Sequence, residues 1–174
     1  AAYSVMMYVD FAFAAVFLGF SMGSGPIISF HFGADNRDEL KSVFRKSMAV
    51  IVLASLAMVA ASELLARPLS AAFVGYSPEL LELTVHGFRI FALSYLFVGF
   101  GIYGSAFFTA LCNGPVSALI SFLRTFLFRG GMVLLLPLVL DLDGIWLAVV
   151  VADGLGANLA LGLIWHYRKR YHYL

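Results

Sequence analysis

Residues 11–30 read FAFAAVFLGFSMGSGPIISF, twenty positions without one charged side chain. About 20 apolar residues in a helix are enough to cross the ~30 Å hydrocarbon core of a bilayer. Gly23 and Pro26 interrupt the run, and both residue types weaken a regular helix. Irregular helices at membrane depth are tolerated beside protein or a water-filled cavity, as in transporters. The stretch therefore predicts a membrane span with a helix break or hinge at Gly23 and Pro26.

The composition of the chain is typical of an integral membrane protein. Of its 174 residues, 62% are hydrophobic and 12% are charged, whereas soluble domains carry about 25% charged residues. The net charge is +1, and no basic patch with interleaved aromatic residues indicates a nucleic-acid partner. Cys112 is the single cysteine, which excludes an intrachain disulfide, and we expect it to be a small buried side chain. No charged segment precedes the first apolar run after Ala1, so we expect part of a longer polypeptide rather than a signal peptide.

Hydropathy, charge clusters and Gly/Pro positions predict an all-α integral membrane protein, a bundle of about five transmembrane helices. The predicted spans cover about residues 3–32, 42–64, 79–111, 116–139 and 145–166. Arg67 and Pro68 mark the end of the second span. Ser77 before Pro78 predicts a helix start, because a capping side chain precedes a proline at the first helical position. Residues 141–144, DLDG, predict a tight turn.

Basic residues orient the predicted bundle. They gather in residues 37–46 and in the RKR of residues 168–170. Because basic loops remain in the cytoplasm, we expect the C-terminus there. The 65–79 loop and the 141–144 turn are then expected outside, in a multi-pass protein of the cell inner (plasma) membrane.

Four charged side chains inside the predicted spans stand out, namely Asp10, Arg124, Arg129 and Asp153. Each costs at least ~2.5 kcal/mol on insertion scales, so each is a candidate for the substrate or ion pathway. Arg129 lies roughly 20 Å from the inner face and Asp153 roughly 14 Å from the outer face, at 1.5 Å per residue. These depths nearly match in a ~30 Å core, which predicts an Arg129–Asp153 pair with Arg124 about one turn away.

Two readings of these charges stay open. The Arg129–Asp153 pair is either a fixed ion pair that joins two helices or a site of ion or proton coupling through Asp153. Asp10 has no evident partner in this chain. It faces either a part of the protein outside this chain or a water-filled cavity, and both a functional role and a merely interfacial one stay open.

Small and aromatic residues predict how the helices pack. Gly19 and Gly23 form a small-xxx-small pattern, which indicates close packing or, alternatively, bending during alternating access. Asn158 predicts an interhelical hydrogen bond. Trp165 and three tyrosines at positions 167, 171 and 173 predict an interfacial aromatic belt.

No motif of an enzyme is present. The chain contains no HExxH, GxSxG or Walker loop and no cluster of metal-ligating residues. We therefore expect no enzymatic activity, no bound metal and no cofactor.

Two segments together resemble the multidrug and toxic compound extrusion (MATE) family. Residues 19–47, GFSMGSGPIISFHFGADNRDELKSVFRKS, are similar to the second helix of a half-unit and its cytoplasmic loop. The pattern G-x-x-P-x-x-x-x-x-x-G-A-x-N falls on Gly23, Pro26, Gly33, Ala34 and Asn36. Residues 110–153 contain Pro115, an Arg124 helix, Pro137 and Gly144-Ile145-Trp146 in the family's order.

The resemblance implies that residues 1–174 are a partial C-terminal lobe of a twelve-helix transporter with two lobes. It implies export of organic, often cationic, compounds in antiport with Na⁺ or H⁺. The implied partners are the bilayer, a small organic substrate and an N-terminal lobe of the same polypeptide. The chain departs from the family because residues 90–111 lack the acid that some members use for a cation site. The alternatives are a lipid-linked oligosaccharide flippase of related architecture and a non-transporting membrane subunit.

Overall fold

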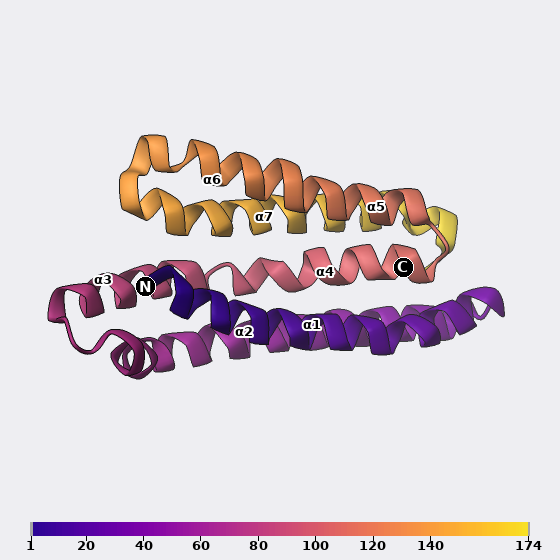
Figure 1. Cartoon of the computed structure of the whole chain (residues 1–174). Helices are drawn as coiled ribbons and strands as arrows, with labels where there is room; N and C mark the ends of the chain where they lie inside the picture. The colour runs from indigo at the N-terminus through magenta and orange to yellow at the C-terminus, as the bar shows by residue number, and fades with distance from the viewer. Residues whose placement is uncertain (1, 174) are drawn as a thin grey trace.

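The computed structural model describes residues 2–173, so Ala1 and Leu174 lie outside the described residues. Helices and short turns make up this part of the chain, and no strand occurs in it (Figure 1). The helices are α1 (Ala2–Gly33), α2 (Arg37–Val74), α3 (Pro78–Ala92), α4 (Tyr95–Ala110), α5 (Gly114–Phe122), the π-helix η1 (Leu123–Gly130), α6 (Gly131–Leu135) and α7 (Pro137–Tyr171).

Helix α4 lies at the centre of the bundle, where it packs against α1 on one side and α7 on the other (Figure 1). Its side chains are apolar or small, and Tyr95, Ile102 and Phe107 are buried. A helix that is apolar all round is a buried helix. Helices α1 and α2 form one side of the bundle, and α5, η1 and α6 run antiparallel to α7 on the other (Figure 1).

The number of membrane spans agrees with the prediction from the sequence. Within residues 2–173, four helices are long and apolar enough to cross a membrane, and the bent pair α3–α4 makes a fifth if it is one span. The chain is therefore an all-α membrane bundle, as expected.

The segment expected as one span over residues 79–111 is instead two helices. They meet at an angle of 43°. At the junction, the N–H of Leu93 donates to Ile90 and that of Ser94 to Phe91, which are bonds over three residues rather than four. This tighter turn bends the chain without a glycine or a proline, so the sequence carried no signal for it.

The expected end of the second span at Arg67 and Pro68 is wrong, because α2 continues to Val74. A proline inside a helix leaves the carbonyl four residues earlier without its donor. Here that carbonyl belongs to Leu64, and both Leu64 and Pro68 are exposed, so the unbonded group faces the surroundings. The turn after α2 is only residues 75–77 rather than 65–79.

The predicted helix start at Ser77 and the predicted turn at residues 141–144 are confirmed. The Ser77 hydroxyl accepts a hydrogen bond from the N–H of Leu80 at 3.4 Å and caps α3. Asp141 has φ 49° and ψ −127°, outside the helical region, and the chain reverses there between α6 and the long part of α7 (Figure 1).

Three side chains lie where the sequence analysis did not expect them. Cys112 is exposed, because it occupies the turn between α4 and α5 with φ 58°. Asn158 donates to the carbonyl of Gly154 at 2.8 Å within its own helix, and it makes no interhelical hydrogen bond within residues 2–173. Tyr173 is fully buried rather than interfacial, and its hydroxyl donates to the carbonyl of Ile164 at 2.6 Å. The left-handed conformation of the preceding residue turns the chain back and explains this burial.

Candidate functional site

Three charged side chains from three separate helical segments meet inside the bundle. Arg129 of η1 places its Nη2 atom 3.6 Å from Oδ2 of Asp153 in α7 and 3.7 Å from Oδ2 of Asp10 in α1. The Asp153 side chain is 2% exposed and that of Asp10 is 11% exposed. The predicted Arg129–Asp153 pair is therefore confirmed. The prediction that Asp10 lacks a partner in this chain is wrong, because the long Arg129 side chain of η1 reaches Oδ2 of Asp10 in α1.

The segment that carries both arginines is a π-helix. Leu123–Gly130 forms hydrogen bonds over five residues, and Arg124 and Arg129 are five residues apart. Such segments are rare and occur frequently at functional sites. No pattern in the sequence predicted this geometry.

Arg124 is held by two glycines of neighbouring helices. A Cβ at Gly101 of α4 would lie 2.8 Å from Cδ of Arg124, and one at Gly156 of α7 would lie 2.8 Å from its Cγ. Any larger residue at either position displaces the arginine stem. In the described part of the chain, its Nε atom is buried without a hydrogen-bond partner, and no carboxylate lies within ion-pair distance of its guanidinium.

A groove between α1 and α4 leads to Arg124. It consists of two adjoining cavities of about 180 Å³ and 370 Å³, which share Ser21, Met22 and Ala106. The smaller cavity contains Arg124, and the larger extends to Ser29. Small side chains therefore leave an open path along these two helices.

Hydroxyl groups of α4 and α5 are linked to one another along this path. The Ser105 hydroxyl lies 2.7 Å from that of Ser121 and 2.9 Å from that of Ser117. The Thr109 hydroxyl lies 2.7 Å from the Ser117 hydroxyl. The result is a row of groups that can donate or accept hydrogen bonds in an otherwise apolar span. Sequence reasoning did not single out these residues, because serine and threonine are common in membrane helices and only their meeting across two helices distinguishes them.

The family model of MatE matches residues 1–131, which is 131 of the 174 residues. The chain belongs to the MatE family. This confirms the resemblance drawn from the sequence and makes the chain a MATE-type transporter chain, of a family of transporters rather than enzymes. Its apolar helices make it a multi-pass membrane protein. No curated protein and no solved structure matches the chain.

The predicted helix break in this MatE chain is not observed, because α1 is continuous through Gly23 and Pro26. Neighbouring helices and local adjustments allow prolines in membrane helices. Close packing at Gly19 and Gly23 is not observed either, since a Cβ at either position would meet no atom within 4 Å in the described part of the chain. Whether Gly23 and Pro26 act as a hinge stays a prediction.

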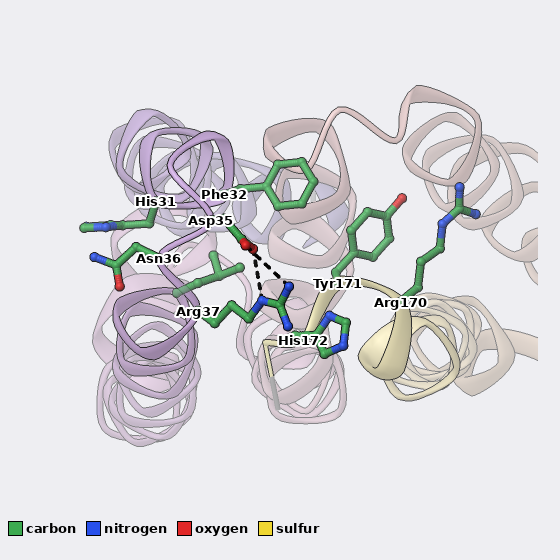
Figure 2. Close-up of a pocket in the computed structure, with 9 residues that line it drawn as sticks. His31, Phe32, Asp35, Asn36, Arg37, Arg170, Tyr171 and His172 are labelled. Carbon is green, nitrogen blue, oxygen red and sulfur yellow. Dashed lines mark hydrogen bonds and ion pairs between the residues drawn. The ribbon is translucent and has the colours of Figure 1, made fainter.

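The two basic segments of the MatE chain meet at one end of the bundle. A cavity of about 160 Å³ lies where the turn after α1 meets the end of α7, and Figure 2 shows the residues that line it. Asp35 and Arg37 point toward each other there, with Arg37 Nε 2.9 Å from Oδ1 of Asp35, and His172 lies beside them. The hydrogen bond and charge of Arg37 hold the pKa of Asp35 below its ordinary value. This exposed ion pair lies in the turn after α1, at the same end of the bundle as the end of α7.

Proposed function

We propose that this MatE chain is one transmembrane lobe, the C-terminal one, of a two-lobe secondary transporter. It exports small organic compounds in exchange for Na⁺ or H⁺. Family membership supports transport in general. The meeting of Asp10, Arg129 and Asp153 inside the bundle is the observation that supports cation coupling.

The cluster places two carboxylates around one guanidinium. Oδ2 of Asp10 and Oδ2 of Asp153 both lie within 4 Å of Nη2 of Arg129, and the Arg124 guanidinium attracts the same two carboxylates from beyond ion-pair distance. Charged side chains at membrane depth are costly and often belong to ion pathways. Binding of a proton or a Na⁺ ion at one of the carboxylates, and its release on the other side of the membrane, would couple the gradient of that cation to a conformational change.

The arrangement of charges also supports an orientation. Residues 37–46 and 168–170 lie at one end of the bundle, and basic ends remain in the cytoplasm. The proposed C-terminus is therefore cytoplasmic, in the cell inner (plasma) membrane. A C-terminal fusion to green fluorescent protein should fluoresce, and a fusion to alkaline phosphatase should be inactive; the opposite result would reverse the orientation.

Dye efflux from proteoliposomes tests the transport proposal. The full-length protein should move a fluorescent dye under a Na⁺ gradient or a pH gradient, and Asp153→Asn should abolish that dependence. Asp143→Asn is the matched control, because Asp143 lies near the outer turn, 54% exposed, and pairs with His86. The control should keep wild-type rates. Absence of dye movement under both gradients would contradict the proposal and favour a non-transporting subunit.

A flippase for lipid-linked oligosaccharides is the second candidate function. Arg124 favours it, because a basic side chain beside a groove suits an anionic diphosphate linker. Transfer of a labelled lipid-linked oligosaccharide between leaflets, without a need for either ion gradient, would support this alternative over antiport.

A further inference from the structure

The groove between α1 and α4 ends at a cation that the charge cluster does not use directly. Arg129 contacts both carboxylates, whereas Arg124 contacts neither within ion-pair distance in residues 2–173. Arg124 lies near the middle of the candidate span Gly114–Leu135. Asp153 and Asp10 attract it from beyond ion-pair distance. A charged side chain at that depth is a functional-site candidate.

The stem of Arg124 is fixed, and its Nε atom has no hydrogen-bond partner among the described residues. Gly101 and Gly156 contact the Cγ and Cδ region of the stem so closely that neither position can hold a Cβ without displacing it. The Nε donor is buried and unbonded among the described residues, and the side chain borders the groove. A buried donor without a partner costs about 1–3 kcal/mol. An acceptor group in the groove would meet the guanidinium where the Arg124 side chain lines the smaller cavity.

The lining of the groove identifies the kind of ligand group. Hydroxyls of Ser21, Ser29, Ser105, Thr109 and Ser121 face it or border it, and Arg124 supplies a positive charge. Among the described residues that line its two cavities, there is no carboxylate and no aromatic ring. Organic cations are usually bound by aromatic faces or carboxylates. Hydroxyls with a guanidinium instead suit carboxylate and phosphate oxygens.

We propose that this groove binds an oxyanion, a carboxylate or phosphate group of the transported compound, with the Arg124 guanidinium as its counter-charge. The inference rests on the proposed transport function and names the substrate class of the same lobe. Ser121 and Ser105 then hydrogen-bond the same group or its neighbouring atoms. The rest of the compound lies in the wider part of the groove toward Ser29.

Binding and transport by the full-length protein test the inference separately. Three fluorescent probes distinguish the ligand groups: fluorescein for carboxylate, 4-methylumbelliferyl phosphate for phosphate, and ethidium for an organic cation. Binding is measured by fluorescence anisotropy or quenching with the protein in nanodiscs. Transport is measured in proteoliposomes under each ion gradient.

We expect at least one oxyanion probe to bind, and Arg124→Gln to weaken that binding at least tenfold. Arg124→Lys should keep part of the affinity, because it keeps the charge but not the planar donor group. Ser121→Ala should weaken binding several-fold without disturbing the arginine. Arg67→Gln is the matched control with unchanged binding, since Arg67 is exposed at the other end of α2. Partial binding by Arg124→Lys also shows that the protein folds with another side chain at this position. A loss of binding in Arg124→Gln then reflects the missing charge rather than misfolding.

The outcomes separate the two proposals. Binding that depends on Arg124, without transport under either gradient, supports the oxyanion site and overturns the antiport proposal. Transport of an oxyanion probe with unchanged affinity in Arg124→Gln overturns the site alone. Binding of ethidium with no binding of either oxyanion probe also overturns it.

Discussion

Loss of the Arg129 charge should destabilise the protein, because it leaves two buried carboxylates together. The perturbation is Arg129→Met, which keeps most of the side-chain volume and removes the guanidinium. Distances of 3.6 Å and 3.7 Å correspond to roughly 4–5 kcal/mol of Coulomb attraction per pair at an effective dielectric constant of ~20. Removing one partner of a buried pair costs about 3–5 kcal/mol in practice. Because the Arg129 side chain is 39% exposed, we expect the lower end, about 3 kcal/mol.

The assay is reversible unfolding of the full-length protein in mixed detergent and dodecyl sulfate micelles, followed by tryptophan fluorescence or circular dichroism. Asp153→Asn in the Arg129→Met background removes one stranded charge. It should recover roughly 1–2 kcal/mol, within the range of coupling energies between contacting residues. Arg67→Met is the control, because its pair with Glu82 is exposed on both sides and such pairs contribute about 0–1 kcal/mol.

Two results would refute this reasoning. One is an Arg129→Met protein whose free energy of unfolding stays within about 0.5 kcal/mol of wild type, the usual size of a surface effect. The other is a double variant no more stable than Arg129→Met alone, which would mean that the two carboxylates do not repel each other in the bundle.

The remaining predictions concern packing and the helix hinge. Gly156→Ala should lower the affinity for an oxyanion probe, because the added Cβ displaces the stem of Arg124. Gly162→Ala in the same helix is the control. Its Cβ meets no described atom within 4 Å, so this variant should bind the probe with wild-type affinity. Tyr173→Phe should lower the free energy of unfolding by about 1 kcal/mol, since it loses the bond to the Ile164 carbonyl; no change on chemical unfolding would mean that the tyrosine is held by packing alone. Pro26→Ala should raise thermal stability, because it restores a helical donor, and it should slow dye efflux only if Pro26 is a hinge. An unchanged efflux rate in a more stable Pro26→Ala protein would rule the hinge out.

The sequence contained enough information to predict the Arg129–Asp153 pair but not the place of Asp10. The short turn at residues 141–144 makes the helices on either side of it neighbours, so depth along each helix was sufficient to bring Arg129 and Asp153 together. Asp10 is on α1, which has no short connection to η1. Its approach depends on how non-consecutive helices pack, and hydropathy carries no information on that.

The sequence predicted local backbone irregularities poorly. Some predicted helix breaks are absent, and some irregularities that occur were not predicted. Pro26 and Pro68 indicated breaks, yet both lie inside continuous helices. The bend at Leu93–Ser94 and the π-helix at Leu123–Gly130 contain no proline. Proline lowers helix stability locally, but packing against neighbouring helices decides whether the helix continues. The same packing can bend or widen a helix whose own sequence favours regularity.

Two pairs of glycines in this chain have different physical roles. Gly19 and Gly23 of α1 meet no described atom at their Cβ positions, so a methyl group there would be accommodated. Gly101 and Gly156 are pressed against the Arg124 stem and cannot accept one without displacing it. An arginine that serves only as a counter-charge needs its guanidinium near a carboxylate, and its stem can adopt several rotamers. Arg124 has the reverse arrangement, with a fixed stem, an Nε atom without a hydrogen-bond partner in residues 2–173 and a groove beside it. Such a preorganised side chain is what the proposed oxyanion site needs.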